Sequence, residues 1–184
     1  MVNLSLRDKV MISIFASLTA IGAFISIPIP YVPFTMQFFF CSISGIILGA
    51  KKGSLSQLLY LFIGLIGIPV FTKGGGPQYI FQPTFGYLIG LIVASYVIGK
   101  VVELRNNNFK NLLLANILGI IFIYLIGVSY FYLINKFYLG IDMTISLAIY
   151  QGLLLTLPGD LIKSIITALV SVRVVNTIKL KTVV

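Results

Sequence analysis

Long apolar stretches separated by short polar segments dominate the pattern of the chain. The first stretch carries no charge from Val10 to Ala50, but three prolines between residues 28 and 33 interrupt it, so we divide it into two helices. A helix needs about 20 apolar residues to cross the hydrocarbon core of a bilayer. The pattern therefore predicts an all-α integral membrane protein, one domain over residues 1–184, with six transmembrane helices at about 9–27, 36–50, 54–71, 85–101, 111–135 and 145–176.

Three connecting segments differ from ordinary solvated loops. Residues 27–37 are apolar and stiffened by proline, with polar groups only near their end, and residues 136–143 form a short connector. Residues 73–84 contain three consecutive glycines followed by aromatic and amide side chains. Glycine permits backbone conformations closed to other residues and close approach to a ligand. We interpret residues 73–84 as part of a binding site, with a plain flexible connector as the alternative.

The basic residues indicate how the chain is oriented. If both ends are cytoplasmic, two basic residues, Lys73 and Lys136, lie outside, against ten inside: Arg7, Lys9, Lys51, Lys52, Lys100, Arg105, Lys110, Arg173, Lys179 and Lys181. Cytoplasmic loops of membrane proteins carry the excess of Lys and Arg. We therefore predict a multi-pass protein of the cytoplasmic membrane with both termini in the cytoplasm and the three unusual segments outside.

The composition excludes several function classes. Hydrophobic residues make up 59% of the chain and charged residues 9%, with a mean hydropathy of +1.09. There is no His and a single Cys, which removes the commonest catalytic base and most transition-metal ligand sets. We expect no enzyme, no metal and no cofactor. The net charge of +9 comes from residues scattered at the ends of apolar runs, which indicates membrane topology rather than nucleic-acid binding.

Asp160 and Lys163 place two opposite charges in an otherwise apolar region. In a helix they stand at i and i+3 and can pair. A charge at the bilayer centre costs about 2.5–3.5 kcal/mol on insertion scales, so intramembrane charges usually mark a pathway or ligand site. A purely structural ion pair is the alternative. Pro158 suits the first turn of a helix and would break a continuous one, so we expect a kink or restart there.

The first predicted helix contains small residues at helical spacing. Ala16 and Ala20 are four residues apart, and Ala23 follows. Small residues at this spacing allow the close backbone approach that drives helix association in lipid. This face is expected to pack either within the protein or against a partner.

Three stretches of the sequence resemble a known family. They are Val32-Pro33-Phe34-Thr35-Met36-Gln37, Pro83-Thr84-Phe85-Gly86-Tyr87-Leu88 and Leu157-Pro158-Gly159-Asp160-Leu161-Ile162-Lys163. In this order they resemble the signature stretches of the BioY family, the biotin-specific S components of energy-coupling-factor (ECF) transporters. In the second stretch, Gln82 and Phe85 replace two glycines of the expected pattern Gly-Pro-Thr-Gly-Gly-Tyr.

The resemblance implies an S-component-like bundle of six helices that captures biotin for uptake. It also implies an energising partner made of a transmembrane T subunit and two ATP-binding subunits. This chain lacks the Gly-x-x-x-x-Gly-Lys-[Ser/Thr] phosphate loop, so we do not expect it to hydrolyse ATP by itself. The motif Ala16-xxx-Ala20, with Ala23, resembles the partner-docking motif of the family's first helix.

The chemistry of biotin agrees with these residues. Its ureido ring has two N–H donors and a carbonyl acceptor, its body is apolar, and its tail ends in a carboxylate. Asp160 can accept from the ureido N–H groups, and Lys163 can donate to a carbonyl or carboxylate. The candidate substrate-binding residues are Asp160, Lys163, Gln82, Tyr87, Thr35, Gln37, Phe34, Gln78, Tyr79 and Thr84.

Three alternatives remain open from the sequence. An S component for another vitamin, such as riboflavin or thiamine, would keep the fold and change the ligand. A proton-coupled transporter would use Asp160 as its titrating carboxylate, although the adjacent Lys163 favours the ionised form. An intramembrane aspartyl protease would need a second membrane carboxylate, and Asp160 is the only one that the predicted spans contain.

Overall fold

The computed structural model describes residues 4–182, with the side chains described up to Val175. The chain is helical apart from one two-stranded antiparallel hairpin and the connecting loops. Its elements are α1 (Leu6–Phe24), β1 (Ser26–Ile27), β2 (Phe34–Thr35), α2 (Gln37–Leu65), the 3₁₀-helix η1 (Pro77–Phe81), α3 (Phe85–Leu104), α4 (Phe109–Leu133), the π-helix η2 (Ile134–Tyr138), α5 (Ile145–Ile149), the π-helix η3 (Tyr150–Leu154) and α6 (Leu157–Thr182).

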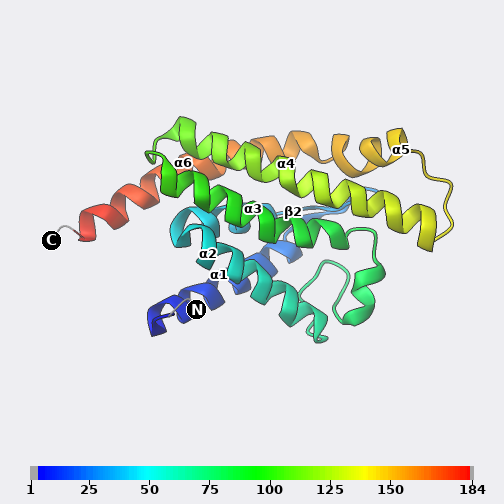
Figure 1. Cartoon of the computed structure of the whole chain (residues 1–184), viewed down its shortest axis with the longest axis horizontal. Helices are drawn as coiled ribbons and strands as arrows, with labels where there is room; N and C mark the ends of the chain where they lie inside the picture. The colour runs from blue at the N-terminus through cyan, green and yellow to red at the C-terminus, as the bar shows by residue number, and fades with distance from the viewer. Residues whose placement is uncertain (1–3, 183–184) are drawn as a thin grey trace.

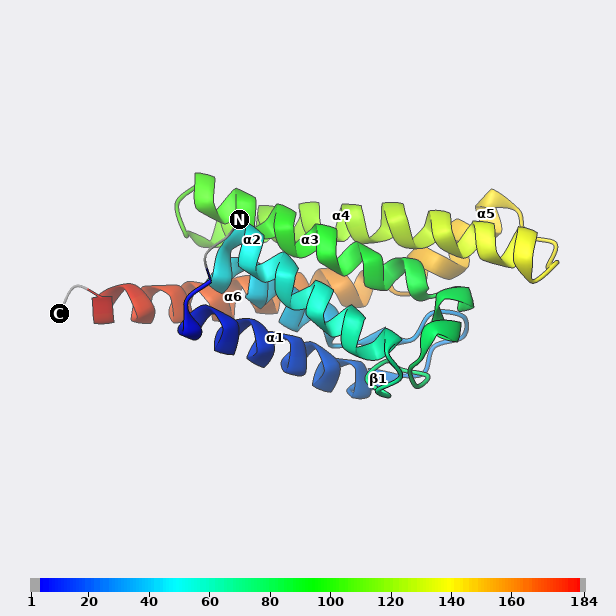
Figure 2. The ribbon, with the colours of Figure 1, turned by 60° about the horizontal axis from the view of Figure 1, so that its bottom comes forward.

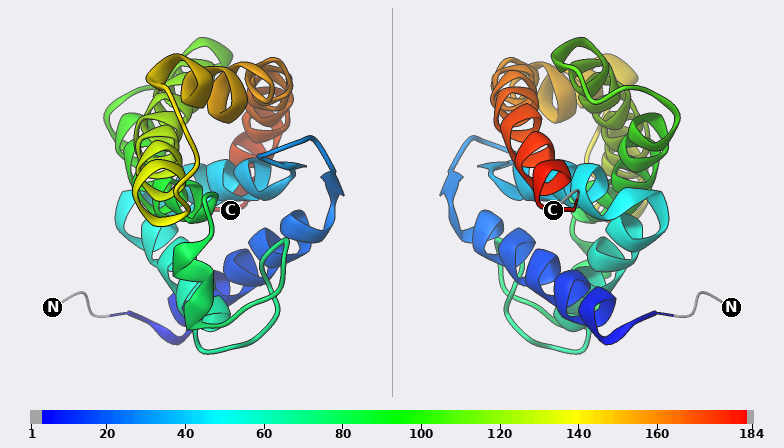
Figure 3. Two further views of the ribbon diagram at one scale, coloured as in Figure 1. Left: turned by 90° about the vertical axis from the view of Figure 1, so that its right-hand side faces the viewer. Right: turned by 90° about the vertical axis from the view of Figure 1, so that its left-hand side faces the viewer.

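The helices lie roughly along one long axis, and the two ends of the bundle hold different elements (Figures 1 and 2). One end holds the start of α1 and the end of α6. The opposite end holds the β1–β2 hairpin, the loop that contains η1, and η2 with the connector to α5. Viewed along that axis, the long helices surround a common interior (Figure 3). The core cluster draws buried residues from α1, α2, α3, α4 and α6.

The start of α1 is fixed by two sets of polar contacts. Ser5 and Asp8 form a capping box, in which each side chain accepts a hydrogen bond from the other's backbone N–H at 3.2 Å. A capping box satisfies two N–H groups that the helix itself leaves without acceptors. Asp8 also pairs with Lys52 of α2 at 2.6 Å. These contacts join the N-terminal end of α1 to the middle of α2.

The helix α2 is two helical arms joined at Gly49. Gly49 has φ +80 and ψ 177, a conformation outside the helical region. The Glu103 carboxylate of α3 accepts the Ala50 N–H at 2.8 Å, so it caps the second arm. We predicted the break between residues 50 and 54. It lies at Gly49 instead, because glycine alone takes this conformation without strain.

The predicted span 54–71 is too long at its C-terminal end. The helix stops at Leu65, Gly67 follows with φ +109, and the chain turns back on itself. Phe71 then lies buried against Gly64, where any larger residue would clash with its ring. The apolar residues after Leu65 are therefore a returning loop that packs on the helix.

The last predicted span, 145–176, is also not one continuous helix. It consists of α5, the π-helix η3 and α6, with a turn at residues 155 and 156. Pro158 stands in the first turn of α6, which confirms the expected restart. There its missing N–H costs no helical hydrogen bond. The restart sets Asp160 and Lys163 on the opening turns of a new helix.

Four helical stretches of the described chain are long and apolar enough to cross a membrane: Gln37–Leu65, Phe85–Leu104, Phe109–Tyr138 and Ile145–Val175. This count does not confirm the six predicted spans. It takes the two arms of α2 as one stretch, and it does not include α1, whose first turns carry Arg7, Asp8 and Lys9. Two residues of the predicted cytoplasmic set, Lys179 and Lys181, have side chains outside the described residues.

The alanines predicted to form a docking face on α1 point into the protein. Ala16 and Ala23 are 2% and 1% exposed, and Ala20 is half-buried against the core. Gly22 lies on the same side, against the backbone of Met36. This small-residue side of α1 therefore packs largely within the chain, and the docking role of Ala16, Ala20 and Ala23 stays a prediction. The opposite side of α1 is exposed, with Val10, Ser13, Ile14, Ser17 and Ile21.

Candidate ligand-binding site

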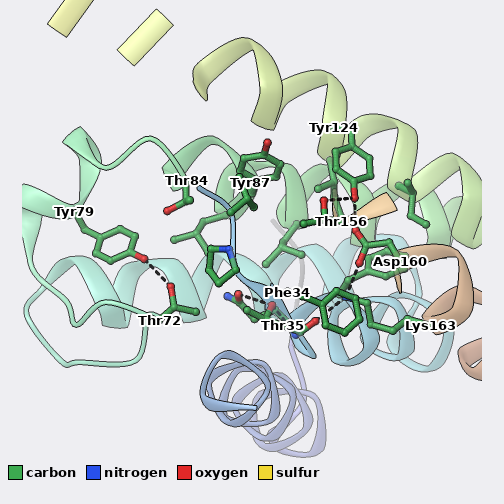
Figure 4. Close-up of a pocket in the computed structure, with 18 residues that line it drawn as sticks. Phe34, Thr35, Thr72, Tyr79, Thr84, Tyr87, Tyr124, Thr156, Asp160 and Lys163 are labelled. Atoms are coloured by element: carbon green, nitrogen blue, oxygen red, sulfur yellow. Dashed lines mark hydrogen bonds and ion pairs between the residues drawn. The ribbon is translucent and has the colours of Figure 1, made fainter. Parts of the chain in front are cut away.

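A cavity opens among the helices toward the end of the bundle that carries the loops (Figure 4). Its empty space is about 680 Å³, counting its opening to solvent. Pockets that bind small organic ligands are mostly apolar, with a few placed polar groups. Each of the three signature stretches contributes to the wall, and α4 completes it. The cavity therefore gathers segments more than 120 residues apart in the sequence.

The two charges of α6 meet inside this cavity. The Lys163 ammonium lies 2.5 Å from the Asp160 carboxylate, and their side chains are 7% and 15% exposed. Lys163 also donates a hydrogen bond to the Thr35 carbonyl at 2.6 Å. Removing charges from water is costly unless each is paired and hydrogen-bonded. Here one ion pair with further polar partners meets that requirement.

Tyr124 of α4 provides the second partner of the carboxylate. Its hydroxyl donates at 2.5 Å to Oδ2 of Asp160, the carboxylate oxygen that Lys163 does not contact, and lies 2.8 Å from the Thr156 hydroxyl. The Thr156 hydroxyl also donates to the Leu153 carbonyl at 3.3 Å, so it links Tyr124 to the turn that precedes α6. Asp160 is thus held from both sides, and the charged group has a fixed orientation toward the cavity (Figure 4).

The segment between α1 and α2 is fastened to this same charged pair. The Lys163 ammonium lies 4.0 Å from the centre of the Phe34 ring, in addition to its bond with Thr35. A cation over an aromatic face is attracted by the ring quadrupole. Phe34 lies directly against Gly159, where a Cβ atom would clash with its ring. Glycine before Asp160 therefore lets the loop close over the start of α6.

A second polar group of the cavity lies away from the ion pair. Thr72 and Tyr79 share a hydrogen bond of 3.1 Å, and Figure 4 places them at the far end from Asp160. Thr84 is buried at the wall, and its hydroxyl has no hydrogen-bond partner within the described chain. The Gln37 amide donates to the Tyr60 hydroxyl at 2.8 Å. The cavity thus has two polar regions with an apolar wall between them.

Tyr87 contributes its ring rather than its hydroxyl. The hydroxyl donates to the Gly152 carbonyl at 2.7 Å, which ties α3 to η3. The ring meets Tyr124 edge to face, with centroids 6.3 Å apart. Such aromatic pairs prefer this arrangement and stiffen the wall that they form.

Eight of the ten predicted binding residues line the cavity: Phe34, Thr35, Gln37, Tyr79, Thr84, Tyr87, Asp160 and Lys163. Gln78 and Gln82 do not. The Gln78 side chain is exposed and turns back to donate to the Gly75 carbonyl at 2.7 Å, and half-buried Gln82 lies at the end of η1. The 3₁₀ turn directs Tyr79 inward and leaves both amides outside the cavity.

Three polar lining residues were missed by the sequence analysis: Thr72, Tyr124 and Thr156. Tyr124 lies in a charge-free span among other aromatic residues, and nothing beside it in the sequence marks it. The available signal was a hydroxyl near the middle of an apolar span, since intramembrane polar groups usually face the protein interior. That signal applies to many residues of this chain and could not single out Tyr124.

Comparison with known proteins identifies the family. The model described as "BioY family" matches residues 1–180. The chain belongs to the BioY family. This finding confirms the resemblance carried by the three signature stretches, which the fold brings to one cavity.

Relatives and a solved structure agree with this membership of the BioY family. The chain is 43% identical over 170 residues to the probable biotin transporter BioY of Lysinibacillus sphaericus, covering 92% of this chain and 87% of the relative. It is 36% identical over 169 residues to the biotin transporter BioY of Thermotoga maritima, covering 91% and 95%. The crystal structure of the S-component for biotin from an ECF-type ABC transporter superposes with a TM-score of 0.80 at 26% identity, covering 96% of this chain and 94% of that one.

Proposed function

We propose that this protein binds biotin with high affinity and serves as the substrate-capture subunit of an ECF-type transporter. The observation that carries the proposal is the Asp160–Lys163 ion pair inside a largely apolar cavity. The biotin transporters among its relatives support the identity of the ligand. The role is binding and uptake rather than catalysis, and biotin is the transported ligand rather than a cofactor.

The cavity matches the distribution of polar groups in biotin. Biotin has a polar ureido ring at one end, a carboxylate at the other and an apolar body between them. The cavity likewise has one polar region around Asp160 and another around Thr72 and Tyr79. Tyr87 stands between the two polar regions, and the Phe34 ring lies beside the charged pair (Figure 4). Thr84 supplies a hydroxyl that no protein group uses among the described residues.

The direct test is a biotin titration of the purified chain in detergent by calorimetry. Saturable binding without a proton gradient or ATP is expected, and excess riboflavin or thiamine should not displace biotin. Displacement by another vitamin would assign the cavity to that ligand. Proton release or uptake that matches ligand binding one to one would favour the proton-coupled alternative, in which Asp160 titrates.

We propose that the chain crosses the cytoplasmic membrane six times, as a single bundle. The count treats α1 and the two arms of α2 on either side of Gly49 as separate crossings. The start of α1 and the end of α6 lie at the same end of the bundle, as an even number of crossings requires. With the excess of basic residues at that end, both termini are cytoplasmic and the cavity faces outward.

We further propose that the energising module, a transmembrane T subunit with two ATP-binding subunits, docks on the exposed side of α1. Ser13 and Ser17 lie four residues apart on that side and border a shallow groove with Val10 and Leu18. Each serine hydroxyl donates to a carbonyl of its own helix at 3.0 Å. The two serines are therefore small and internally satisfied, which suits close packing of a partner helix at this point of α1.

Uptake by this protein is expected to require the ATP-binding subunits. No phosphate-loop motif occurs in the chain, so it lacks the usual means of holding a nucleotide. Proteoliposomes that contain this chain alone should bind biotin but not concentrate it. Accumulation of radiolabelled biotin against a gradient, driven by ATP and without other subunits, would contradict this expectation.

Tyr124→Phe is expected to weaken biotin binding by about 1–3 kcal/mol, the usual cost of leaving a buried polar group without a partner. The substitution keeps the ring and removes the hydroxyl that donates to Asp160 and contacts the Thr156 hydroxyl. Calorimetric titration measures the change. Tyr96→Phe is the matched control, because Tyr96 is 44% exposed on α3 and does not line the cavity, and this variant should bind as the parent does.

A further inference from the structure

A second, apolar hollow lies outside the ligand cavity, between α4 and the segment formed by α5 and η3. Its empty space is about 1,140 Å³, counting its wide opening. No residue that lines it within the described chain is charged. The hydroxyl of Ser129 donates to the Leu125 carbonyl of its own helix, and that of Tyr124 donates to Asp160. The groove therefore presents apolar surface along its length.

The length of this groove corresponds to one leaflet of a bilayer. Its lining on α4 runs from Ile121 to Leu133, about 18 Å at 1.5 Å per residue. The hydrocarbon core is about 30 Å thick, so one leaflet contributes roughly 15 Å. Ile121, Leu125 and Leu133 are 53%, 62% and 50% exposed within the chain. An acyl chain of one leaflet fits along these residues.

A cation stands at the loop-side end of the groove. Lys136 follows Leu133 by one turn, and its ammonium donates to the hydroxyl of Tyr132 at 2.7 Å. It also lies 5.2 Å from the centre of the Tyr132 ring, which lines the groove. Lys136 is exposed, and two of its three N–H donors have no described partner. They are placed to bind a phosphate oxygen at the level of the lipid headgroups.

We propose that this groove binds one anionic phospholipid, with an acyl chain along α4 and its phosphate on Lys136. The inference rests on the proposed membrane placement and not on the identity of the transported ligand. Tyr124 lines both the groove and the ligand cavity. The acyl chain therefore packs behind Tyr124 and closes the lipid-facing side of the cavity.

The absence of tryptophan from this chain provides a background-free test. Leu125→Trp places a single fluorophore in the groove, and phospholipids with brominated acyl chains quench it on contact. Ile162→Trp is the control reporter, because Ile162 is 59% exposed on α6 and does not line the groove. It lies two residues from Asp160, which contacts Tyr124 of the groove, so both reporters belong to the same part of the bundle. Ile121→Trp replaces the first reporter if Leu125→Trp does not fold.

Brominated phosphatidylglycerol is expected to bind at the groove reporter about fivefold more tightly than brominated phosphatidylcholine, the factor contributed by one lysine near an anionic surface. Lys136→Ala should abolish this preference, and Lys73→Ala, the matched change in another loop at the same end, should preserve it. The Ile162→Trp reporter should show no preference.

Three outcomes would overturn the proposal. They are equal quenching by the two lipids at the groove, a preference that survives Lys136→Ala, and the same preference at both reporters. Absent quenching in the groove, as expected if a second copy of the chain covers it, would also overturn it.

Discussion

Asp160→Asn and Lys163→Ala are each expected to weaken biotin binding by about 2–5 kcal/mol, the range for breaking a desolvated charge pair. The side chains are buried together, and each carries a further contact, to Tyr124 or to the Thr35 carbonyl. Removing one partner leaves the other charge buried and unpaired. Calorimetric titration of the purified variants gives the loss directly.

Lys100→Ala is the matched control for Lys163→Ala. Lys100 and Glu103 form an ion pair at the same i, i+3 spacing, at 3.5 Å, but with side chains 51% and 44% exposed. Exposed pairs contribute little, so this variant should bind biotin as the parent does. The double variant Asp160→Asn, Lys163→Ala should lose less than the sum of the single changes, because the two residues share one interaction. Single variants that fold and keep parental affinity would reduce the pair to a structural role.

Most of the site could be predicted because its residues fall in short, chemically distinctive segments. Charges, prolines and glycines in an apolar chain are rare enough to be noticed, and they marked residues 32–37, 83–88 and 157–163. The structure brings these segments to one cavity. Tyr124 was not predicted because its role depends on how α4 faces α6, a tertiary relation that no local pattern encodes.

The ends of the helices were harder to predict than their existence. Apolar character alone extended the third span to Phe71, whereas the chain reverses at Gly67 and returns over Gly64. A loop that packs inside a membrane protein is as apolar as a helix, so hydropathy does not separate the two. Pro158 predicted the restart of α6, but nothing in the sequence predicted the π-helical turn η3 before it, because such a turn leaves composition unchanged.

The direction in which α1 presents its small residues could not be predicted from spacing. Ala16 and Ala20 have the spacing typical of close helix packing, but spacing does not say whether the neighbour is in the same chain. In the structure that neighbour is the core of the protein itself, and Ala16 is 2% exposed. Ser13 and Ser17 have the same spacing on the exposed side. The proposed contact with the energising module therefore moves to this pair.

Ser13→Leu combined with Ser17→Leu is expected to abolish assembly with the energising module while leaving biotin binding intact. Leucine in place of serine fills the shallow groove on α1 and holds a partner helix away. A loss of about 1.4 kcal/mol in contact free energy already lowers association tenfold. Co-purification with the T and ATP-binding subunits measures assembly, and calorimetric titration measures biotin binding.

Two comparison variants separate docking from folding. Ser129→Leu is the matched control, since Ser129 is exposed on α4 and its hydroxyl also donates to its own helix, and it should assemble normally. Ala16→Leu should instead destabilise the chain itself by about 1–3 kcal/mol, the usual cost of overpacking a core, and reduce biotin binding with it. A Ser13, Ser17 double variant that still co-purifies with the module would exclude this side of α1 as the docking surface. One that loses biotin binding would show that these serines support the fold of the chain rather than its assembly.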